Sequence, residues 1–556
     1  MAATKAHLVL ASVASANRSK QRVPSSDRLA DLFAPLGVLL SEGGDDRLTL
    51  AADTGLNAYG CQPRPRTGAI SFSSSTATSI SDRAYWHARA AQERLIEEAS
   101  VKGLFEAFET RMEYTRQALL TYLDLTGSGV EVVLSPSGTD AQLHALFFAK
   151  LHFGDSPVTS VIVGSDQTGS GTIFTATGRH FNARTARGKR VLKGSAVGGW
   201  NQDLQSVGVP FAENSGQIRS ATEMDCATLA AVEDEIRQGR CVVLQAMHAS
   251  KFGWQAPSDD CIAQIAARWP QRVSVAIDAC QMRIGRAKIG KYLDRNYLVL
   301  VTGSKYFTGQ PFSGALLVPS ALSNRLATLD KLPSGLGDYA TRSDFPLAWP
   351  GIRSGFALEP NFGQWLRWET ALEEMRHYYA LSPLYRQTVL TGLAEIIPQI
   401  IDASDRLELV PVYHHDITGA DEEFSCPTIF PFLIRGGGGY LNVDDVAVLY
   451  RALNRDMTSE MSLGDARITS RQCQIGQPVA MGLPGQSGIA ALRIAVGSRT
   501  LFEAWSVGSG AEERAIQSIA GDIQIVIRKI ELLLRHHDRW AAGCPTQATG
   551  RPHHAP

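Results

Sequence analysis

Three strings of polar residues could hold an anion and carry a reaction. The first, SPSGTDAQ (135–142), follows an apolar run and precedes a stretch with helical spacing. Ser137, Gly138 and Thr139 would offer hydroxyls and backbone N–H groups at a helix N-terminus, which is an arrangement that binds phosphate. A Ser-Gly-Thr-Asp string is also an ordinary helix cap, so this string alone leaves both interpretations open.

A carboxylate and an amine follow two later apolar runs. Asp278 ends the run SVAID, and Lys305 stands in VTGSKYF just past the next strand expected. Singly, such residues are usually solvated loop positions or caps. Together with a phosphate cradle they are the three attachments of pyridoxal phosphate, because the lysine forms a Schiff base and the carboxylate pairs with the pyridinium nitrogen.

These strings resemble the fold type I pyridoxal phosphate enzymes, in particular the class V aminotransferase and cysteine desulfurase superfamily. The motifs of that family are matched by SGTD (137–140), DACQ (278–281), TGSK (302–305), Gly309 and GAL (314–316). The resemblance covers residues 55–500, and DACQ with GSK is its specific part.

The resemblance implies a role for each matching residue at the cofactor. Lys305 would be the Schiff-base lysine, Asp278 would contact the pyridine nitrogen and Gln281 the ring hydroxyl. The phosphate would be held by Ser137, Gly138, Thr139 and Thr302. Ser304 takes the place of the usual His beside the lysine, and Gln167 or a neighbour takes the place of the ring-stacking His, a position that His180 does not fit cleanly.

Substrate contacts are implied by three later strings. Arg493 in LRIAVGS is the candidate clamp for the α-carboxylate, with an ordinary surface Arg as the alternative. In MHASKFGWQAP (247–257), His248 is the candidate catalytic residue and Ser250 the candidate substrate contact, and a core or capping role is the alternative for each. Arg471 is a second candidate anion anchor.

The chain departs from the family pattern at two further places. Phe356 follows IRSG (352–355) where the family has a Thr that reaches the partner subunit's phosphate in the homodimer, which puts that contact in doubt. Ile475 stands where one desulfurase branch carries its nucleophilic Cys, and Cys473 falls two positions early. We therefore expect no thiol nucleophile.

The elements that must position these residues read as an α/β protein. Short apolar runs at 130–135, 159–164, 241–247, 272–278, 297–303 and 313–319 alternate with helical stretches, which predicts a mainly parallel sheet covered on both faces. The resemblance implies seven strands. A helix pair broken near Gly103 is expected over 82–125.

The expected domains are an N-terminal extension (1–50), a large cofactor domain (51–355), a smaller α+β domain (356–540) and a disordered tail (541–556). Residues 51–81, rich in Gly, Pro, Ser and Thr, are expected to form a loop at the substrate entrance. Arg64 and Arg66 in this loop could meet an acidic side chain, or form a solvated turn.

Composition excludes several classes of function. The 54 Lys and Arg nearly balance the 55 Asp and Glu among 556 residues, so no general basic field favours nucleic acid. No apolar run reaches membrane-spanning length. The eight scattered Cys and the absence of ligand-spaced motifs predict neither a disulfide framework nor a metal site. The stretch after Lys5 has the pattern of a short signal peptide but a weak apolar run, so we expect a cytoplasmic protein.

These observations predict a pyridoxal phosphate-dependent homodimer that acts on a free amino acid. An aminotransferase needs only the parts named above and is the first hypothesis. A lyase of the desulfurase or kynureninase kind and a decarboxylase are the alternatives. A non-catalytic phosphate-binding α/β protein, in which Lys305 is structural, is the rival from another class.

Overall fold

The computed structural model describes residues 26–200, 203–329, 333–411, 423–461, 465–483 and 486–536. The stretch after Lys5 and the expected tail (541–556) lie outside the described residues. Within the described part, no helix combines the length and the apolar character needed to cross a membrane.

A seven-stranded sheet forms the larger layer, in the order β2-β8-β7-β6-β5-β3-β4. Its strands are β2 (Glu131–Ser135), β3 (Val158–Val163), β4 (Leu204–Val209), β5 (Cys241–Met247), β6 (Val273–Asp278), β7 (Leu298–Thr302) and β8 (Gly314–Val318). Only β8 runs antiparallel to its two neighbours. The predicted α/β class with a mainly parallel sheet of seven strands is confirmed.

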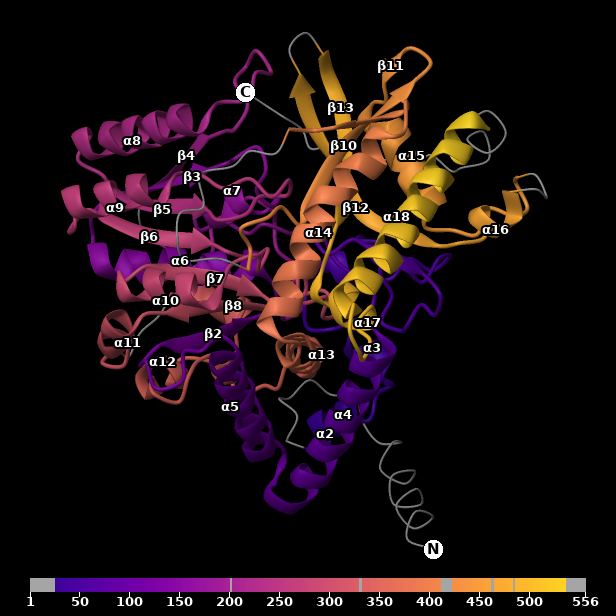
Figure 1. Ribbon diagram of the computed structural model, residues 1–556. Helices are drawn as coiled ribbons and strands as arrows, with labels where there is room; N and C mark the ends of the chain where they lie inside the picture. Colours follow the sequence, from indigo (N-terminus) through magenta and orange to yellow (C-terminus); the bar gives the residue numbers. More distant parts are fainter. Residues whose placement is uncertain are drawn as a thin grey trace, which may run out of the picture.

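Helices cover both faces of this sheet (Figure 1). They are α6 (Gly138–Phe153), α7 (Thr172–Thr175), α8 (Ala221–Arg237), α9 (Asp259–Arg268), α10 (Arg286–Asp294) and α11 (Ser320–Leu326). Side chains alternate along each strand, so Val132 and Leu134 belong to the core cluster that also holds buried residues of α5, α8, α9 and α10, while Val133 belongs to the cluster that holds those of α6. Both faces are therefore buried, as the continuous apolar runs predict.

The second sheet has the order β1-β12-β13-β10-β11, with β9 also paired to β10. Its strands are β1 (Ile70–Phe72), β9 (Leu407–Leu409), β10 (Ile429–Gly436), β11 (Gly439–Tyr440), β12 (Cys473–Leu483) and β13 (Gln486–Ala495). Strand β1 pairs in parallel with β12, Ile70 opposite Cys473. The expected loop over 51–81 thus contains a strand of this sheet, and the expected domain limits stay predictions.

The remaining long helices fall into two groups of three. The first group is α14 (Pro383–Asp402), α15 (Val443–Leu453) and α18 (Ala511–Arg535). The second is α4 (Asp82–Lys102), α5 (Leu104–Tyr122) and α13 (Phe362–Ala380), which packs against the first two. Gly103, with φ 87°, separates α4 from α5 where predicted. Both helices extend away from the sheets at the bottom of Figure 1.

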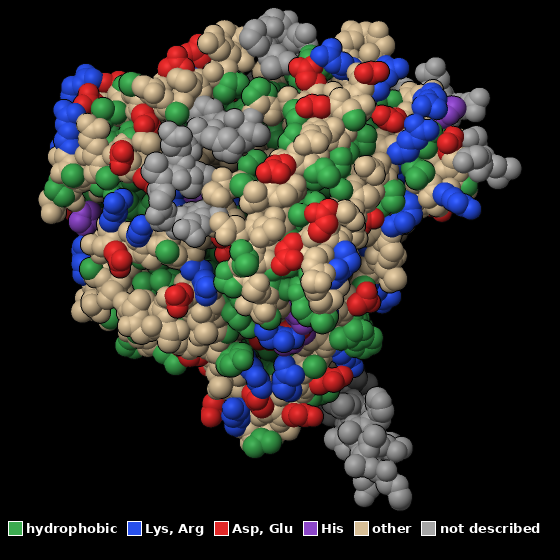
Figure 2. All heavy atoms as spheres, viewed as in Figure 1, with side chains coloured by type: hydrophobic (Ala, Val, Ile, Leu, Met, Phe, Trp, Pro, Cys, Tyr) green, Lys and Arg blue, Asp and Glu red, His purple; other side chains and the backbone are tan. Residues whose placement is uncertain are grey.

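Short helical segments complete the described chain. They are α2 (Ser26–Leu32), α3 (Leu36–Leu39), α12 (Pro350–Ser354), α16 (Ala466–Thr469), α17 (Ser498–Glu503) and 3₁₀ turns at Asp46–Leu48, Ser334–Asp338 and Arg342–Asp344. On the face seen in Figure 2, acidic and basic side chains are interspersed without a broad region of one sign. Any anionic ligand must therefore be met by a local site.

Candidate active site

A cavity of about 480 Å³ lies where the carboxyl ends of β5, β6 and β7 face β12 and β13. It is lined by most of the residues predicted from the sequence, namely Ser137, Gly138, Thr139, Gln167, Ser250, Asp278, Gln281, Thr302, Ser304, Lys305 and Arg493. Carboxyl ends of parallel strands are where open α/β sheets bind ligands. The two other predicted residues, His248 and Arg471, do not line this cavity.

The string 137–139 forms the N-terminus of α6, at the cavity. Ser137 caps the helix, its hydroxyl accepting from the backbone N–H of Asp140 at 3.2 Å. A Cβ at Gly138 would stand 2.7 Å from Cys280 Sγ, so only glycine permits the close approach of this turn to the end of β6. The 16-residue helix α6 begins here, so its N-terminus places backbone N–H groups and the positive end of its dipole at the cavity.

Arg47 reaches the same cradle and was missed by sequence reasoning. Its guanidinium is paired with Asp45 (Nε to Oδ1 2.9 Å) and lies 3.4 Å from the hydroxyls of Ser137 and Thr139. Burial and the Asp45 carboxylate raise the pKa of Asp140 to about 7, which reduces the negative charge beside the cradle at neutral pH. No motif marks Arg47, because it comes from a short 3₁₀ turn in the N-terminal extension.

Asp278 ends β6 with its carboxylate at the cavity. Oδ1 accepts from the backbone N–H of Cys280 at 3.1 Å, and Oδ2 accepts from Gln142 Nε2 at 3.4 Å. Gln142 is itself fixed by Thr175, whose hydroxyl donates to Oε1 at 2.8 Å. Gln142, another cavity residue missed from the sequence, holds the carboxylate in place.

Lys305 follows β7 and also lines the cavity. Among the described residues its ammonium has neither a hydrogen-bond partner nor an ion-pair partner. Nearby, the Thr302 hydroxyl donates to the carbonyl of Cys280 at 2.7 Å, and Gln281 Nε2 donates to the carbonyl of Ser75 at 2.9 Å. These bonds join the strand ends and leave Lys305 as the free amine of the group.

Arg493 projects from β13 on the other side of the cavity. It donates to the carbonyls of Gln477 (2.6 Å) and Lys251 (3.1 Å) and to the Thr76 hydroxyl (2.9 Å). Burial lowers its pKa to about 10, so it stays charged at neutral pH. No carboxylate of the described chain contacts it, and its buried Nε has no partner there.

The loop after β5 contains two predicted residues, of which Ser250 lines the cavity and His248 does not. The Ser250 hydroxyl accepts from the N–H groups of Phe252 and Trp254 at 3.1 Å each and donates to Gln167 Oε1, so Ser250 braces the loop and orients Gln167. His248 instead packs edge-on against Tyr292, 6.3 Å between ring centroids. Burial lowers the pKa of His248 to about 3, so its imidazole is neutral at neutral pH, and because it packs outside the cavity its catalytic role stays a prediction.

Arg471 lies at a separate cavity of about 360 Å³, which Arg66 and Arg499 also line. Arg471 precedes β12 and does not line the main cavity, so its role as a second anion anchor stays a prediction that this position does not support. Arg66 donates to Asn454 Oδ1 at 2.5 Å and is likewise not at the main cavity.

Three further residues, at positions where the family pattern places functional groups, make structural contacts within the described chain. Cys473 is fully buried in β12, and burial raises the pKa of its thiol to about 11, in line with the expectation that this thiol is no nucleophile. Arg353 forms an ion pair with Glu109. Phe356 packs on Phe345 with 4.5 Å between ring centroids.

No family model matches the chain, and no curated protein matches it. Solved structures do match. A NifS-like protein is 11% identical, over 82% of this chain and 99% of that chain, with a TM-score of 0.44. A cysteine desulfurase from Escherichia coli is 12% identical, over 82% and 95%, with a TM-score of 0.43. A tryptophan decarboxylase of Catharanthus roseus, solved with L-tryptophan, is 15% identical, over 92% and 91%, with a TM-score of 0.44.

Proposed function

We propose that the protein is a pyridoxal 5′-phosphate-dependent enzyme that acts on a free amino acid. The observation that carries the proposal is one cavity lined by the helix N-terminus at 137–139, the carboxylate of Asp278 and the unpaired ammonium of Lys305. Three buried polar atoms on the cavity wall, Ser75 Oγ, Ser313 Oγ and Arg493 Nε, lack partners within the described chain. Orphaned polar atoms of this kind suit a polar ligand that completes their hydrogen bonds.

The residues of the sheet edge would hold the cofactor. Ser137, Gly138 and Thr139 would bind its phosphate, and Asp278 would accept a hydrogen bond from its ring nitrogen. When bound through Lys305, the cofactor supplies an electron sink for bonds at the amino acid's Cα. Gln142 and the Cys280 N–H keep the Asp278 carboxylate oriented for that contact.

Two side chains would act on the substrate. Arg493, held by two carbonyls and a hydroxyl, would bind the α-carboxylate and so orient the bonds at Cα. Lys305, the free amine of the cavity, would take up and return the proton at Cα. We propose transamination because these residues suffice for it.

The proposal includes a homodimer, and light scattering on the purified protein tests that oligomeric state.

Among the residues that the structure describes, none supplies this cavity with the thiolate that desulfurase chemistry needs. Cys473 lies outside it, and Cys280, which lines it, is a buried thiol whose pKa burial raises well above the ordinary value. A lyase or a decarboxylase would use the same cofactor contacts and is an outcome of the test.

The test begins with protein purified in the presence of the cofactor. We expect a visible absorbance band that Lys305→Ala abolishes and that Lys291→Ala, at an exposed position of α10, retains. Unchanged spectra for Lys305→Ala would contradict the proposal. An aminotransferase then releases keto acid in an amount equal to the protein and continues only when a second keto acid is added. Release of carbon dioxide, sulfide or ammonia without that requirement would identify a decarboxylase or lyase.

A further inference from the structure

The cavity holds more positive charge than the proposed function uses. Its cationic lining residues are Arg47, Lys251, Lys305 and Arg493, and its acidic ones are Asp166 and Asp278. Arg47 is paired with Asp45, Lys305 would hold the cofactor and Arg493 would bind the α-carboxylate. Lys251 is left without a function.

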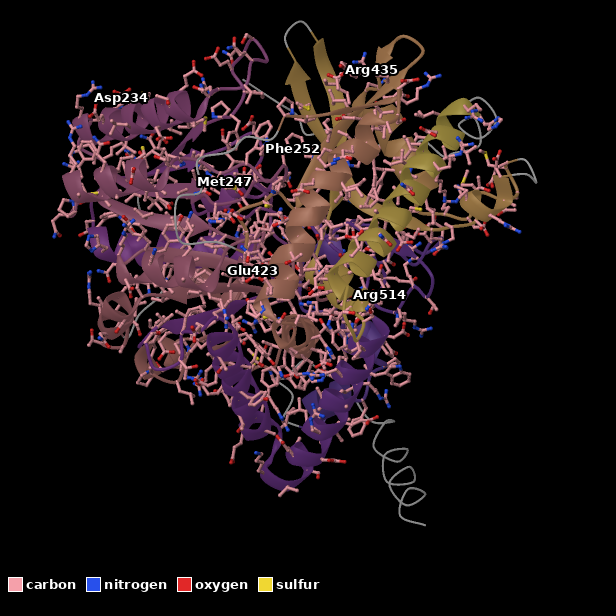
Figure 3. The ribbon with its side chains drawn as sticks, in the orientation of Figure 1. Asp234, Met247, Phe252, Glu423, Arg435 and Arg514 are labelled. Atoms are coloured by element: carbon pink, nitrogen blue, oxygen red, sulfur yellow. The ribbon has the colours of Figure 1, made fainter. Side chains whose placement is uncertain are left out.

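The loop that carries Lys251 is pinned at the cavity. Ser250 and Trp254 are joined by a backbone hydrogen bond of 2.8 Å, and Gly253 N–H donates to the Ser250 carbonyl at 3.0 Å. Figure 3 labels the flanking residues, Met247 at the end of β5 and Phe252, on the side of the seven-stranded sheet that faces the second sheet. A braced turn holds a side chain at a fixed place, so Lys251 is presented to the cavity by rigid backbone.

Lys251 and Arg493 are neighbours that come from different elements. The Lys251 carbonyl accepts from Arg493 Nη1 at 3.1 Å, which joins the loop after β5 to β13. Both side chains line the same cavity. A short molecule with two anionic groups could therefore reach both cations at once.

The Lys251 ammonium has no anionic partner of its own. Within the described residues it makes no hydrogen bond or ion pair, and both oxygens of Asp166 already accept backbone N–H groups of Phe211 (2.8 Å) and Ala212 (3.1 Å). Burial and the like charges of Arg493 and Lys305 lower the pKa of Lys251 to about 8. A partly buried cation beside two other cations is unfavourable until an anion joins it.

We propose that Lys251 binds a second anionic group of the substrate, so that the enzyme's substrates are amino acids with an acidic side chain. The inference rests on the proposed function, in which Arg493 takes the α-carboxylate. A neutral side chain would leave the ammonium without an anionic partner in the cavity, and that cost is the basis of discrimination.

The test compares ligands on the cofactor-loaded protein by titration calorimetry. Succinate, with two carboxylates, should bind at least tenfold tighter than propionate, with one. Lys251→Met should abolish the preference, Lys251→Arg should keep it, and Lys291→Met is the matched exposed control. In turnover, kcat/KM of Lys251→Met should fall at least tenfold for acidic amino acids and not for neutral ones of equal length.

Failure of this inference can be distinguished from failure of the proposed function. Equal binding of the two acids, or a preference that persists in Lys251→Met, would overturn the inference. A missing Lys305-dependent absorbance band would instead overturn the proposed function. Thermal unfolding checks that Lys251→Met folds, and Lys251→Glu, which should reverse the preference toward propionate, gives a second reading.

Discussion

The wall of the cavity formed by the seven-stranded sheet differs from the opposite wall in how its polar side chains are placed. On the sheet wall, Asp278 is the last residue of β6, Lys305 lies in the turn that follows β7, and residues 137–139 form the start of α6. On the opposite wall, Arg47 comes from a 3₁₀ turn and Arg493 from within β13, each held by several hydrogen bonds. The side chains of the sheet wall are placed by the ends of single strands and helices. The arginines of the opposite wall are placed by hydrogen bonds to other segments of the chain.

If the sheet wall carries the chemistry, the largest loss should follow Asp278→Asn. The amide cannot stabilise a protonated ring nitrogen, so we expect kcat to fall about 10²–10³-fold. Cofactor content, measured after release by denaturation, should change little, because the phosphate cradle and Lys305 remain. A kcat near the wild-type value would exclude the proposed contact between Asp278 and the ring nitrogen.

Arg493→Lys tests the opposite wall. A lysine cannot reproduce the fork of hydrogen bonds, so KM for the amino acid should rise about 10–100-fold while kcat falls less. Because Arg493 also ties Gln477, Thr76 and Lys251 together, thermal unfolding must be measured alongside. A raised KM with an unchanged unfolding temperature identifies substrate binding, and the reverse pattern identifies a purely structural arginine.

A smaller effect is expected where the two walls meet at the phosphate cradle. Arg47→Gln alone would leave the Asp45 carboxylate buried and unpaired, so the informative variant is Asp45→Asn with Arg47→Gln. We expect its affinity for the cofactor to fall about tenfold. Titration followed by the visible band measures this, and unchanged affinity would show that Arg47 only orders the N-terminal turn.

The smallest effect concerns His248, outside both walls. Its pKa is about 3 in the folded protein against 6.5 ordinarily, so between these values the unfolded state binds more protons and stability falls as the pH falls. His248→Phe should remove about 1 kcal/mol per pH unit of this dependence between pH 6 and pH 4. Urea unfolding at both pH values checks it, and parallel curves would show that His248 is not buried in solution.

The sequence predicts the sheet and its strand ends well, because a strand buried on both faces is a continuous apolar run. It predicts α4 and α5 because their buried residues recur at helical spacing, and the break between them because glycine at 103 interrupts that pattern. Strand β4 was missed because it lies at the sheet edge, half-exposed, with mixed residues. Strand β12 was missed because QCQIGQPV has little apolar alternation, and its partner β13 pairs with it through register shifts.

The site divides in the same way. Short-range motifs predict Asp278, Lys305 and 137–139, whose positions depend on one strand or one helix each. Arg47 carries no such pattern, because it reaches the cavity from a distant part of the chain. Gln142 and Lys251 lie within the strings already singled out, but residue type alone does not show which members of those strings face the cavity. His248 does not line the cavity although its neighbours Met247 and Ala249 do, and spacing alone does not show which of adjacent side chains faces the cavity.

The parallel pairing of β1 with β12 also orders events during synthesis. Residues 131–318, which form the whole seven-stranded sheet, leave the ribosome long before residue 473, the partner of Ile70. The larger layer can therefore fold while β1 waits for its partner, and non-local pairings of this kind form slowly. We expect the cavity, whose opposite wall needs β12 and β13, to be completed only after both strands have been synthesised, so that a nascent chain acquires ligand binding after the seven-stranded sheet is formed.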